Sequence, residues 1–187
     1  MKIDKCSGSF FESLYKKNSD PWNFEHDPYE IARYDSIIKA IGHKRYSKAF
    51  EPGCSIGILT ERLATLCDEV IAIDISPTAL HMAQKRCTHL KNVFLTCHSI
   101  NEWSIDKATD LIVLCEIGYY FEVQQWKKIV SDLIKLCGIS STLIAAHWLG
   151  KSSDHMLSGN EVHQAIMHID GLELQYSEKH ELFRLDR

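Results

Sequence analysis

The seven residues Glu51–Gly57 place the strongest constraint on how this chain can fold. They read Glu-Pro-Gly-Cys-Ser-Ile-Gly, follow a short apolar run, and precede an amphipathic helical pattern over residues 58–66. A strand, a glycine-containing turn and a helix in this order form the first unit of a nucleotide-binding α/β fold. Gly53 and Gly57 can adopt backbone angles that other residues avoid, and they let a ligand lie close to the chain. We therefore expect a ligand at the start of the helix, where unpaired N–H groups carry a partial positive charge.

The spacing of the glycines disfavours a dinucleotide site. Such a turn reads G-x-G-x-x-G, and an alignment on Gly53 puts Ser55 and Ile58 where glycine is required. The order acidic-x-Gly-x-Ser-x-Gly resembles the E/D-x-G-x-G-x-G loop of class I S-adenosylmethionine-dependent methyltransferases, with Ser55 at the middle glycine. An ordinary strand–helix turn without a ligand is the alternative for this loop alone.

Asp74 is a second indication of an adenosine site. It ends an apolar run over residues 70–73, which predicts a buried parallel strand, and it lies 17 residues beyond Gly57. A carboxylate at the carboxyl tip of the second strand can accept both hydroxyls of a ribose. Asp74 could instead cap the next helix, but Ser76 directly precedes Pro77 and suits the N-cap better.

Length and composition fit a single domain that binds small molecules. The chain has 187 residues, of which 45% are hydrophobic and 25% charged, with a net charge of −4. Because no run is rich in Lys and Arg, we expect no nucleic-acid partner. No apolar stretch approaches the length of a membrane span and no signal peptide opens the chain, so we expect neither a membrane anchor nor secretion. The seven cysteines form no C-x-x-C pair, which fits a reducing cytoplasm; the oligomeric state is left open.

Residues 1–47 precede the nucleotide-binding unit, and we predict that they form a helical lid over the cofactor. A stripe of apolar residues over 10–15 indicates one helix, and a proline after Asp20 ends it. A second helix is predicted from about Tyr29 to Ile41, with Asp27 as N-cap. Packing over the sheet edge is the alternative for this segment, and residues 48–187 would form the Rossmann-like core.

The later elements complete a sheet with helices on both faces. Strands are predicted over residues 92–96, 110–115 and 141–146, a sheet-covering helix over 123–136, and a helix opened by a capping box at 158–161. Residues 172–176 and 181–185 are predicted to form a closing antiparallel pair. The polar segment 151–156 can line an acceptor pocket or serve as an exposed connection.

Motifs along most of the chain resemble the nodulation protein S family of methyltransferases. They are Asp20-Pro21-Trp22, Tyr29-Glu30-x-x-Arg33-Tyr34, Arg45-Tyr46, the 51–57 loop with Leu59-Thr60, Leu63-Ala64-x-x-Cys67-Asp68, Ala72-x-Asp74-x-Ser76, Asp110-Leu111-Ile112-Val113-Leu114-x-Glu116, Tyr119-Tyr120, Gly159-x-Glu161-Val162-His163 and Arg184-Leu185-Asp186. The resemblance implies an α/β, Rossmann-like class I methyltransferase fold: a mostly parallel seven-stranded sheet with helices on both faces and an N-terminal helical lid. It implies S-adenosylmethionine as methyl donor and S-adenosylhomocysteine as product. It also implies an N-methyltransferase acting on the free amine of an amino sugar or chitooligosaccharide, since the family members of understood role methylate that amine.

Two alternatives stay open beside that activity. One is an O- or N-methyltransferase of an unrelated small metabolite, and the other is a non-catalytic protein that binds S-adenosylmethionine. A panel of amines distinguishes the non-catalytic protein from an enzyme, because the non-catalytic protein would bind the cofactor but transfer no methyl group.

The resemblance to class I methyltransferases also implies which residues contact the cofactor. Arg33 would be available to the methionine carboxylate. After the third strand such enzymes often present a polar group to the adenine; Ser99 or backbone N–H groups would do so here, because no carboxylate follows until Glu102. Trp103 could cover the adenine face or pack on the surface. The complete predicted cofactor set is Trp22, Arg33, Glu51, Gly53, Cys54, Ser55, Gly57, Asp74, Ile75, Ser99, Ile100 and Cys115.

We expect the chemistry at the tip of the fourth strand, because ligands of open α/β sheets bind outside the carboxyl ends of the strands. The tip lacks the D/N-P-P-Y/F motif of adenine- and glutamine-specific methyltransferases. Methyl transfer is an in-line displacement that depends mostly on alignment, but an aliphatic amine must also lose a proton. The candidate catalytic residues are Glu116, Tyr119, Tyr120 and His147, with His155 as a further base. A packing or strand-end role is the alternative for each, and we predict no metal site because the histidines form no ligand pattern.

Overall fold

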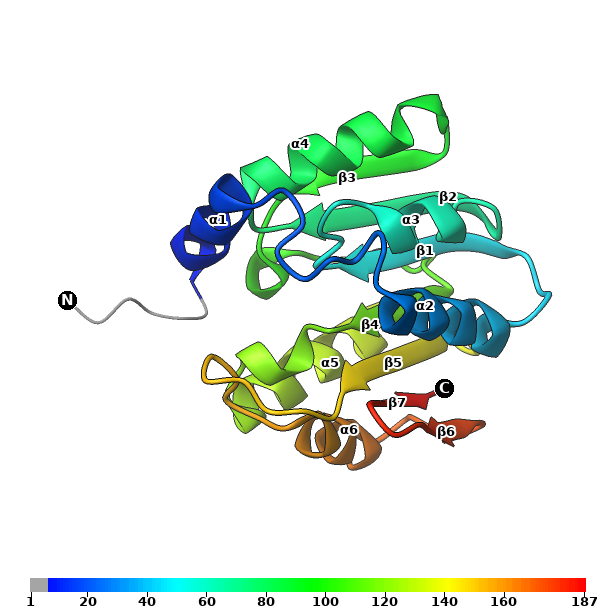
Figure 1. Ribbon diagram of the computed structural model, residues 1–187. Helices are drawn as coiled ribbons and strands as arrows, with labels where there is room; N and C mark the ends of the chain where they lie inside the picture. The colour runs from blue at the N-terminus through cyan, green and yellow to red at the C-terminus, as the bar shows by residue number, and fades with distance from the viewer. Residues whose placement is uncertain (1–6) are drawn as a thin grey trace.

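A seven-stranded sheet forms the centre of the computed structural model, which describes residues 7–187 (Figure 1). The strands are β1 Tyr46–Pro52, β2 Cys67–Asp74, β3 Val93–Cys97, β4 Leu111–Cys115, β5 Thr142–Trp148, β6 Ser177–Lys179 and β7 Phe183–Asp186. The α-helices are α1 Gly8–Lys17, α2 Pro28–Ile41, α3 Ile58–Leu63, α4 Pro77–Arg86, α5 Val123–Leu136 and α6 Gly159–Met167. Short 3₁₀ turns are η1 Cys87–His89, η2 Ile100–Glu102 and η3 Gly118–Tyr120.

The strand order is β3-β2-β1-β4-β5-β7-β6. The pairs β1–β2, β1–β4, β2–β3 and β4–β5 are parallel, whereas β7 runs antiparallel to both β5 and β6. The carboxyl ends of β1, β2 and β4 therefore meet at one edge of the sheet, with Pro52 opposite Ile73. The mostly parallel, seven-stranded sheet predicted from the sequence is confirmed.

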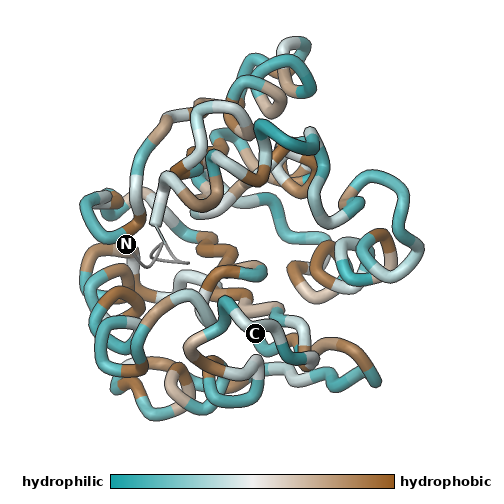
Figure 2. Tube along the Cα trace, turned by 60° about the vertical axis from the view of Figure 1, so that its left-hand side comes forward, coloured by the Kyte–Doolittle hydropathy of each residue, from teal (hydrophilic) through white to brown (hydrophobic). Residues whose placement is uncertain are grey.

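The two faces of the sheet are covered by separate layers of helices. On one face Ile37 of α2, Leu63 of α3 and Leu80 of α4 join one hydrophobic core, and on the other Trp126 of α5 and Val162 of α6 join a second. Along the helices in Figure 2 hydrophobic and hydrophilic residues alternate, as expected for helices that bury one side against a sheet. The predicted covering of both faces is confirmed, and among residues 7–187 no helix has the length and hydropathy to cross a membrane.

Helix capping follows the predicted pattern. The Asp27 side chain accepts a hydrogen bond from Tyr29 N–H at the start of α2, and the Ser76 hydroxyl accepts one from Ala79 N–H at the start of α4. Ser158 and Glu161 form a complete capping box on α6. Helix starts are thus well predicted, because the side chains that cap them are local in sequence.

Among the element boundaries that differ from the prediction, two lie at the β5–β7–β6 end of the sheet. The closing pair lies further along the chain than residues 172–176 and 181–185: β6 begins at Ser177, since Leu172 N–H instead bonds back to Ile169 O in a turn after α6. β5 extends to Trp148, two residues beyond its predicted end, because β7 pairs with it as far as Trp148 opposite Phe183. His147 is consequently inside a strand.

Helix α1 lies off the carboxyl ends of the parallel strands, beside the start of α4 (Figure 1). The Glu12 carboxylate accepts hydrogen bonds from the Ser76 hydroxyl at 2.7 Å and from the Thr78 N–H at 3.0 Å. An anion is favoured at this place, because the first N–H groups of a helix are unpaired and carry partial positive charge. Residues far apart in the sequence thereby bring α1 to the edge of the sheet where ligands of this fold class bind.

Candidate active site

A cavity of about 460 Å³ opens at the carboxyl ends of β1, β2 and β4. Its walls come from α1 and the loop after it, the start of α2, the first turn after β1, the tips of β2 and β3, the turn after β4, and the loop after β5. The volume lies in the ordinary range for a small-molecule site. The lining residues are Phe11, Tyr15, Trp22, Phe24, Tyr29, Glu30, Gly53, Ser55, Ile73, Asp74, Ile75, His98, Ser99, Ile100, Asn101, Glu116, Ile117, Tyr119, Tyr120, Phe121, Trp148, Lys151, Ser152, Asp154 and His155.

The turn after β1 is fixed by hydrogen bonds from its backbone N–H groups to β2. Gly53 N–H donates to Ile73 O at 2.7 Å, and Ser55 N–H donates to the Asp74 carboxylate at 2.8 Å. Gly53 and Ser55 have φ values of 74° and 52°, in the left-handed region that favours glycine. Gly57 has φ 82°, and a Cβ there would meet the Ala83 Cβ at 3.0 Å. Gly57 thus permits close packing of α4, whereas Gly53 and Ser55 face the cavity.

Asp74 is buried at the end of β2 with its carboxylate on the cavity wall. Its second oxygen accepts the Ser76 N–H at 2.8 Å. Burial raises its pKa to about 6, although the backbone hydrogen bonds from Ser76 and Ser55 oppose that shift. A carboxylate has about four acceptor positions, so Asp74 keeps capacity for ligand hydroxyls beside these two bonds.

Aromatic residues from the N-terminal segment form one wall of the cavity. The rings of Trp22 and Phe24 stack with centroids 5.5 Å apart, and Tyr15 packs edge-on against Trp22 at 5.7 Å. The Tyr15 hydroxyl is hydrogen-bonded to the Ser55 hydroxyl in the turn after β1, and the Phe11 ring contacts the Tyr120 ring. The segment before β1 therefore contacts both the Gly53–Gly57 turn and the turn after β4.

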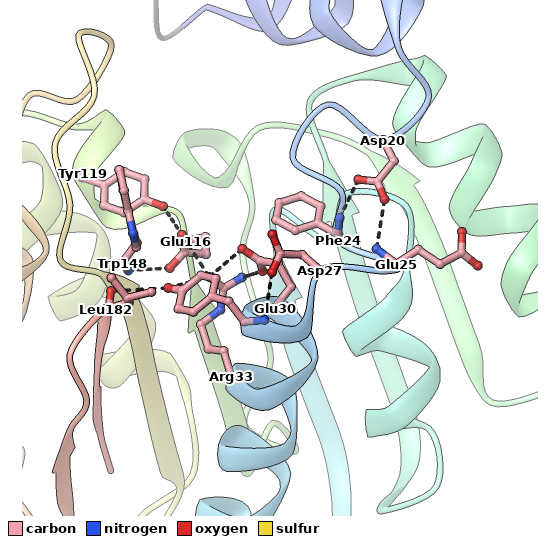
Figure 3. Close-up of polar contacts among 11 residues, drawn as sticks. Asp20, Phe24, Glu25, Asp27, Glu30, Arg33, Glu116, Tyr119, Trp148 and Leu182 are labelled. Atoms are coloured by element: carbon pink, nitrogen blue, oxygen red, sulfur yellow. Dashed lines mark hydrogen bonds and ion pairs between the residues drawn. The ribbon is translucent and has the colours of Figure 1, made fainter.

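Glu116 is the polar centre of the opposite wall (Figure 3). One of its carboxylate oxygens accepts the Trp148 N–H at 2.7 Å, and the other accepts the Tyr119 hydroxyl and lies 3.3 Å from the Arg33 guanidinium. Its φ of 56° lies in the left-handed region of the backbone. These three donors fix the orientation of the Glu116 carboxylate.

Arg33 pairs with two carboxylates at once (Figure 3). Its guanidinium is fully buried, hydrogen-bonded to Glu30 one helical turn earlier on α2 and ion-paired with Glu116 across the cavity wall. Burial raises the pKa of Glu30 to about 7, although the neighbouring Arg33 opposes the shift. Glu30 lines the cavity, so this wall holds two carboxylates against a single buried cation.

A family model decides the relationship of this chain to known proteins. The model described as nodulation protein S matches residues 12–168. The chain belongs to the nodulation protein S family. The match begins within α1 and ends just after α6, so it includes every cavity-lining residue named above except Phe11.

Two relatives within the family show how distant the similarity is. The chain is 25% identical over 127 residues to nodulation protein S of Rhizobium tropici, covering 67% of this chain and 53% of the relative. It is 29% identical over 128 residues to nodulation protein S of Bradyrhizobium diazoefficiens, covering 67% of this chain and 61% of the relative. The matched region thus spans between about half and three fifths of these relatives.

Solved structures show the same fold. The N-methyltransferase NodS of Bradyrhizobium japonicum WM9, crystallised with S-adenosylhomocysteine, superposes with a TM-score of 0.82 at 22% identity, covering 94% of this chain and 95% of that chain. The DhpI–S-adenosylhomocysteine complex superposes with a TM-score of 0.74 at 14% identity, covering 99% of this chain and 96% of that chain. The predicted class I methyltransferase fold is confirmed.

The cavity brings together ten of the residues in the predicted cofactor and catalytic sets. They are Trp22, Gly53, Ser55, Asp74, Ile75, Ser99 and Ile100 from the cofactor set, and Glu116, Tyr119 and Tyr120 from the catalytic set; His155, the further base, also lines it. Asp74 and Glu116 reach the same cavity because β2 and β4 flank β1.

Five members of the predicted cofactor set lie behind the cavity wall. Glu51 is buried, with its carboxylate accepting the Thr60 hydroxyl at 2.6 Å. Arg33 is already paired with two carboxylates, so it is not free in this structure to meet a cofactor carboxylate as predicted. The others in this position are Cys54, Gly57 and Cys115.

The location predicted for His147 is corrected by the structure. We placed it at the end of a strand facing the site, but β5 continues past it and its side chain is fully buried. Its Nε2 accepts the Gly118 N–H at 3.0 Å. Burial and the neighbouring His163 hold the pKa of His147 well below its usual range. His147 therefore has no access to an acceptor amine.

The loop after β5 lines the cavity. Of the two roles left open for residues 151–156, lining a pocket or serving as an exposed connection, the structure shows the first. His155 stacks on Tyr119 with ring centroids 3.8 Å apart, and Tyr119 O accepts the Met156 N–H at 2.8 Å. Glu30 and Tyr15 also line the site without having been selected from the sequence. For Glu30 the sequence held a usable signal, because Glu30 belongs to a family motif, next to Tyr29 and three residues before Arg33. Tyr15 lies in none of the family motifs. Among residues 7–187, no three His, Cys, Asp or Glu side chains gather in a way that could hold a metal ion.

Proposed function

We propose that this chain is an S-adenosylmethionine-dependent methyltransferase that transfers a methyl group to the free amine of a small polar acceptor, such as an amino sugar. The observation that carries the proposal is that one and the same cavity has Asp74 on one wall and the carboxylates of Glu30 and Glu116 on the other. Family membership and the fold shared with methyltransferases support the reaction class. An amine acceptor is supported by the two carboxylates, because an ammonium group is attracted to a wall of negative charge.

The wall around Asp74 fits the adenosine part of the cofactor. Asp74 offers acceptor positions for the ribose hydroxyls, and Gly53 leaves the turn after β1 open, with the nearest side-chain atom 3.4 Å from the place of a Cβ. Ile75 and Ile100 provide apolar surface for the adenine, and Ser99 caps η2 beside them. We further propose that residues 7–47 act as a lid, since Trp22 closes this end of the cavity.

Several residues behind the wall support the cofactor site indirectly. Glu51 holds the start of α3 through Thr60, and Gly57 lets α4 approach. Cys54 and Cys115 fill the core beneath the strand tips. We therefore propose that these four residues shape the site without contacting the ligand.

The opposite wall suits an amine. When bound, S-adenosylmethionine would supply a methyl carbon made electrophilic by its positively charged sulfur, with the neutral thioether of S-adenosylhomocysteine as the leaving group. Glu116, oriented by the Tyr119 hydroxyl and Trp148 N–H, holds and aligns the nitrogen. Tyr120 and His155 provide ring surface beside it.

We propose Glu30 as the group that takes the proton of the acceptor ammonium. An amine must be neutral to attack, and a base is most effective when its pKa lies near the working pH. Burial places the pKa of Glu30 at about 7, whereas Glu116 already accepts three hydrogen bonds or ion pairs. The Arg33 guanidinium, paired with both carboxylates, offsets part of their mutual repulsion.

The free cysteines suit a reducing compartment. Cys54, Cys67, Cys87, Cys97, Cys115 and Cys137 are all unpaired in the described part of the chain. We therefore propose a cytoplasmic location.

Calorimetric titration with S-adenosylhomocysteine, run beside NAD, tests the cofactor first. We expect binding of S-adenosylhomocysteine alone; binding of NAD alone, or of neither, would contradict the proposal. Incubation with S-adenosylmethionine and a panel of amines, including glucosamine oligomers, then tests the acceptor by a mass increase of one methyl group. Transfer to a hydroxyl or to an unrelated amine would correct the acceptor class, and binding without any transfer would indicate a non-catalytic protein.

A further inference from the structure

A chain of three buried polar side chains lies beneath the turn that follows β4. The Asp186 carboxylate of β7 is 2.7 Å from His163 Nδ1 of α6, and His163 Nε2 is 3.3 Å from His147 Nδ1 of β5. His147 Nε2 in turn accepts the Gly118 N–H at 3.0 Å. Both imidazoles are fully buried, and no step proposed above uses them.

The backbone N–H of Gly118 fixes the direction of every hydrogen bond in this chain. An N–H can only donate, so His147 Nε2 must carry no proton, and the neutral ring then carries its proton on Nδ1. That proton is donated to His163 Nε2, which must therefore be an acceptor. The remaining proton of His163 is on Nδ1 and is donated to Asp186. A proton added to Nε2 of either ring would place two donors face to face.

The turn above this chain has little freedom to move. A Cβ on Gly118 would lie 2.4 Å from Val162 Cγ1 and 2.9 Å from the Trp126 ring, so the backbone is pressed against α5 and α6. Next to Gly118, Tyr119 bonds to Glu116 through its hydroxyl and to Met156 N–H through its carbonyl. A displacement of Gly118 would therefore carry the acceptor-facing groups with it.

Asp186 is itself held in place. Its Oδ1 accepts the Ser177 hydroxyl at 2.6 Å, and the Arg184 guanidinium lies 2.8 Å from its Oδ2. Burial raises its pKa, but the hydrogen bonds from His163 and Ser177 outweigh this and lower the pKa to about 2. A charged, anchored carboxylate on β7 thus terminates the hydrogen-bond chain at its far end.

We propose that His147, His163 and Asp186 are positioning residues that set the shape of the Glu116–Tyr120 turn through the Gly118 N–H. The catalytic consequence rests on the proposed function, in which this turn holds the acceptor amine. The hydrogen-bond chain itself does not depend on the identity of the acceptor, and it links the 159–163 and 184–186 motifs, which the cavity does not use, to the site.

Nitrogen-15 NMR of histidine-labelled protein at neutral pH tests the hydrogen-bond chain without any substrate. We expect two rings in the Nδ1–H form, assigned to His147 and His163 by their absence from the His147→Gln and His163→Gln spectra. A ring with its proton on Nε2, or a charged ring, at either position would overturn the proposal.

The link to Gly118 is tested by hydrogen exchange of its amide in matched variants. His163→Phe removes the acceptor for His147, and we expect the Gly118 amide to exchange about tenfold faster or more. His163→Gln keeps an acceptor at the same place and should restore protection. Gln164→Ala, next to His163 on the exposed side of α6, is the control and should leave the exchange of the Gly118 amide unchanged. Wild-type exchange in His163→Phe, with the protein folded, would overturn the proposal.

Kinetics with an identified acceptor then separate positioning from general support of the fold. We expect His163→Phe to lower kcat about tenfold with the affinity for S-adenosylhomocysteine unchanged. Equal losses of kcat and of S-adenosylhomocysteine affinity would indicate a general structural role and overturn the positioning role. If no acceptor is found, the NMR and exchange results still decide the hydrogen-bond chain, and only the proposed function fails.

Discussion

Glu12 of α1 and Thr78 of α4 are joined by two hydrogen bonds, one from the Thr78 N–H at 3.0 Å and one from its hydroxyl at 2.7 Å. The same carboxylate also accepts the Ser76 hydroxyl. Burial raises the pKa of Glu12, but the hydrogen bonds from Ser76 and Thr78 outweigh it and lower the pKa to about 2. A single acidic residue therefore supplies much of the polar attachment of the proposed lid.

Replacement of Glu12 by alanine should detach α1 from α4. Three donors lose their charged acceptor, and we expect a weakening of S-adenosylhomocysteine binding by about tenfold, measured by calorimetry, and faster proteolysis within residues 7–22. Lys16→Ala is the control, because Lys16 is largely exposed and its ion pair with Glu12 contributes little. Since the pKa of Glu12 is lowered in the folded state, its contribution is present above the ordinary value of 4.5 and is lost as the pH falls from there to about 2. Unchanged affinity in Glu12→Ala would show that α1 is held by other contacts.

Asp74→Asn should weaken the binding of S-adenosylhomocysteine by about a hundredfold, because the amide cannot accept hydrogen bonds at both of its ends. The pKa of Asp74 is raised to about 6 by burial, so wild-type affinity should also fall as the pH drops below that value. Asp68→Asn is the matched control, since Asp68 lies on the same strand with an exposed side chain. If both variants bind alike, Asp74 does not contact the cofactor.

Glu30→Gln should remove a titration from the pH profile of turnover. In the wild type, Glu30 must be deprotonated to take the proton of the acceptor, so turnover should rise with pH through about 7. The glutamine variant should lose about a hundredfold in kcat and show no inflection there. Glu25→Gln, which changes an acid paired with Arg86 on the surface, should behave as wild type. An inflection retained in Glu30→Gln would assign it to another group.

Glu51→Gln should make the free energy of unfolding less dependent on pH. Burial raises the pKa of Glu51 from 4.5 to about 8, so across this window the folded state binds a proton that the unfolded state does not. Stability therefore falls as the pH rises through the window. Glutamine can still accept the Thr60 hydroxyl, and we expect the variant to gain about 2 kcal/mol over the wild type at the upper end. Urea unfolding at both ends of the window measures this. Glu69→Gln is the control, because Glu69 lies on β2 with a partly exposed side chain paired with Lys48. An equal pH dependence in Glu51→Gln and wild type would exclude Glu51 as the source.

Local signals in the sequence were sufficient for most of the fold. Asp27, Ser76 and Ser158 cap helices through bonds to residues two or three positions away, so the helix starts were predictable. The strand tips bearing Asp74 and Glu116 were predictable too, because buried parallel strands read as apolar runs ended by a polar residue.

Contacts between distant segments were not predictable in the same way. His147 follows an apolar run and has the sequence context of a strand-tip residue; only pairing with β7 places it inside the sheet. Arg33 was assigned to the cofactor, and its ion pair with Glu116 was missed. Glu116 is more than eighty residues away in the sequence, and only the tertiary fold brings the two side chains together. The role of Tyr15 was missed for the same reason, since its bond to Ser55 depends on the docking of α1.

The aromatic wall formed by Trp22, Phe24 and Tyr15 gives the protein an optical reporter of its own. An indole stacked at the cavity wall changes its emission when water beside it is replaced by a ligand, while Trp126 is fully buried in the opposite layer and serves as a constant reference. Occupancy of the cavity can therefore be followed by intrinsic fluorescence at low concentration, without a label. The Trp22→Phe variant separates the signal of this wall from that of Trp148, which also lines the cavity.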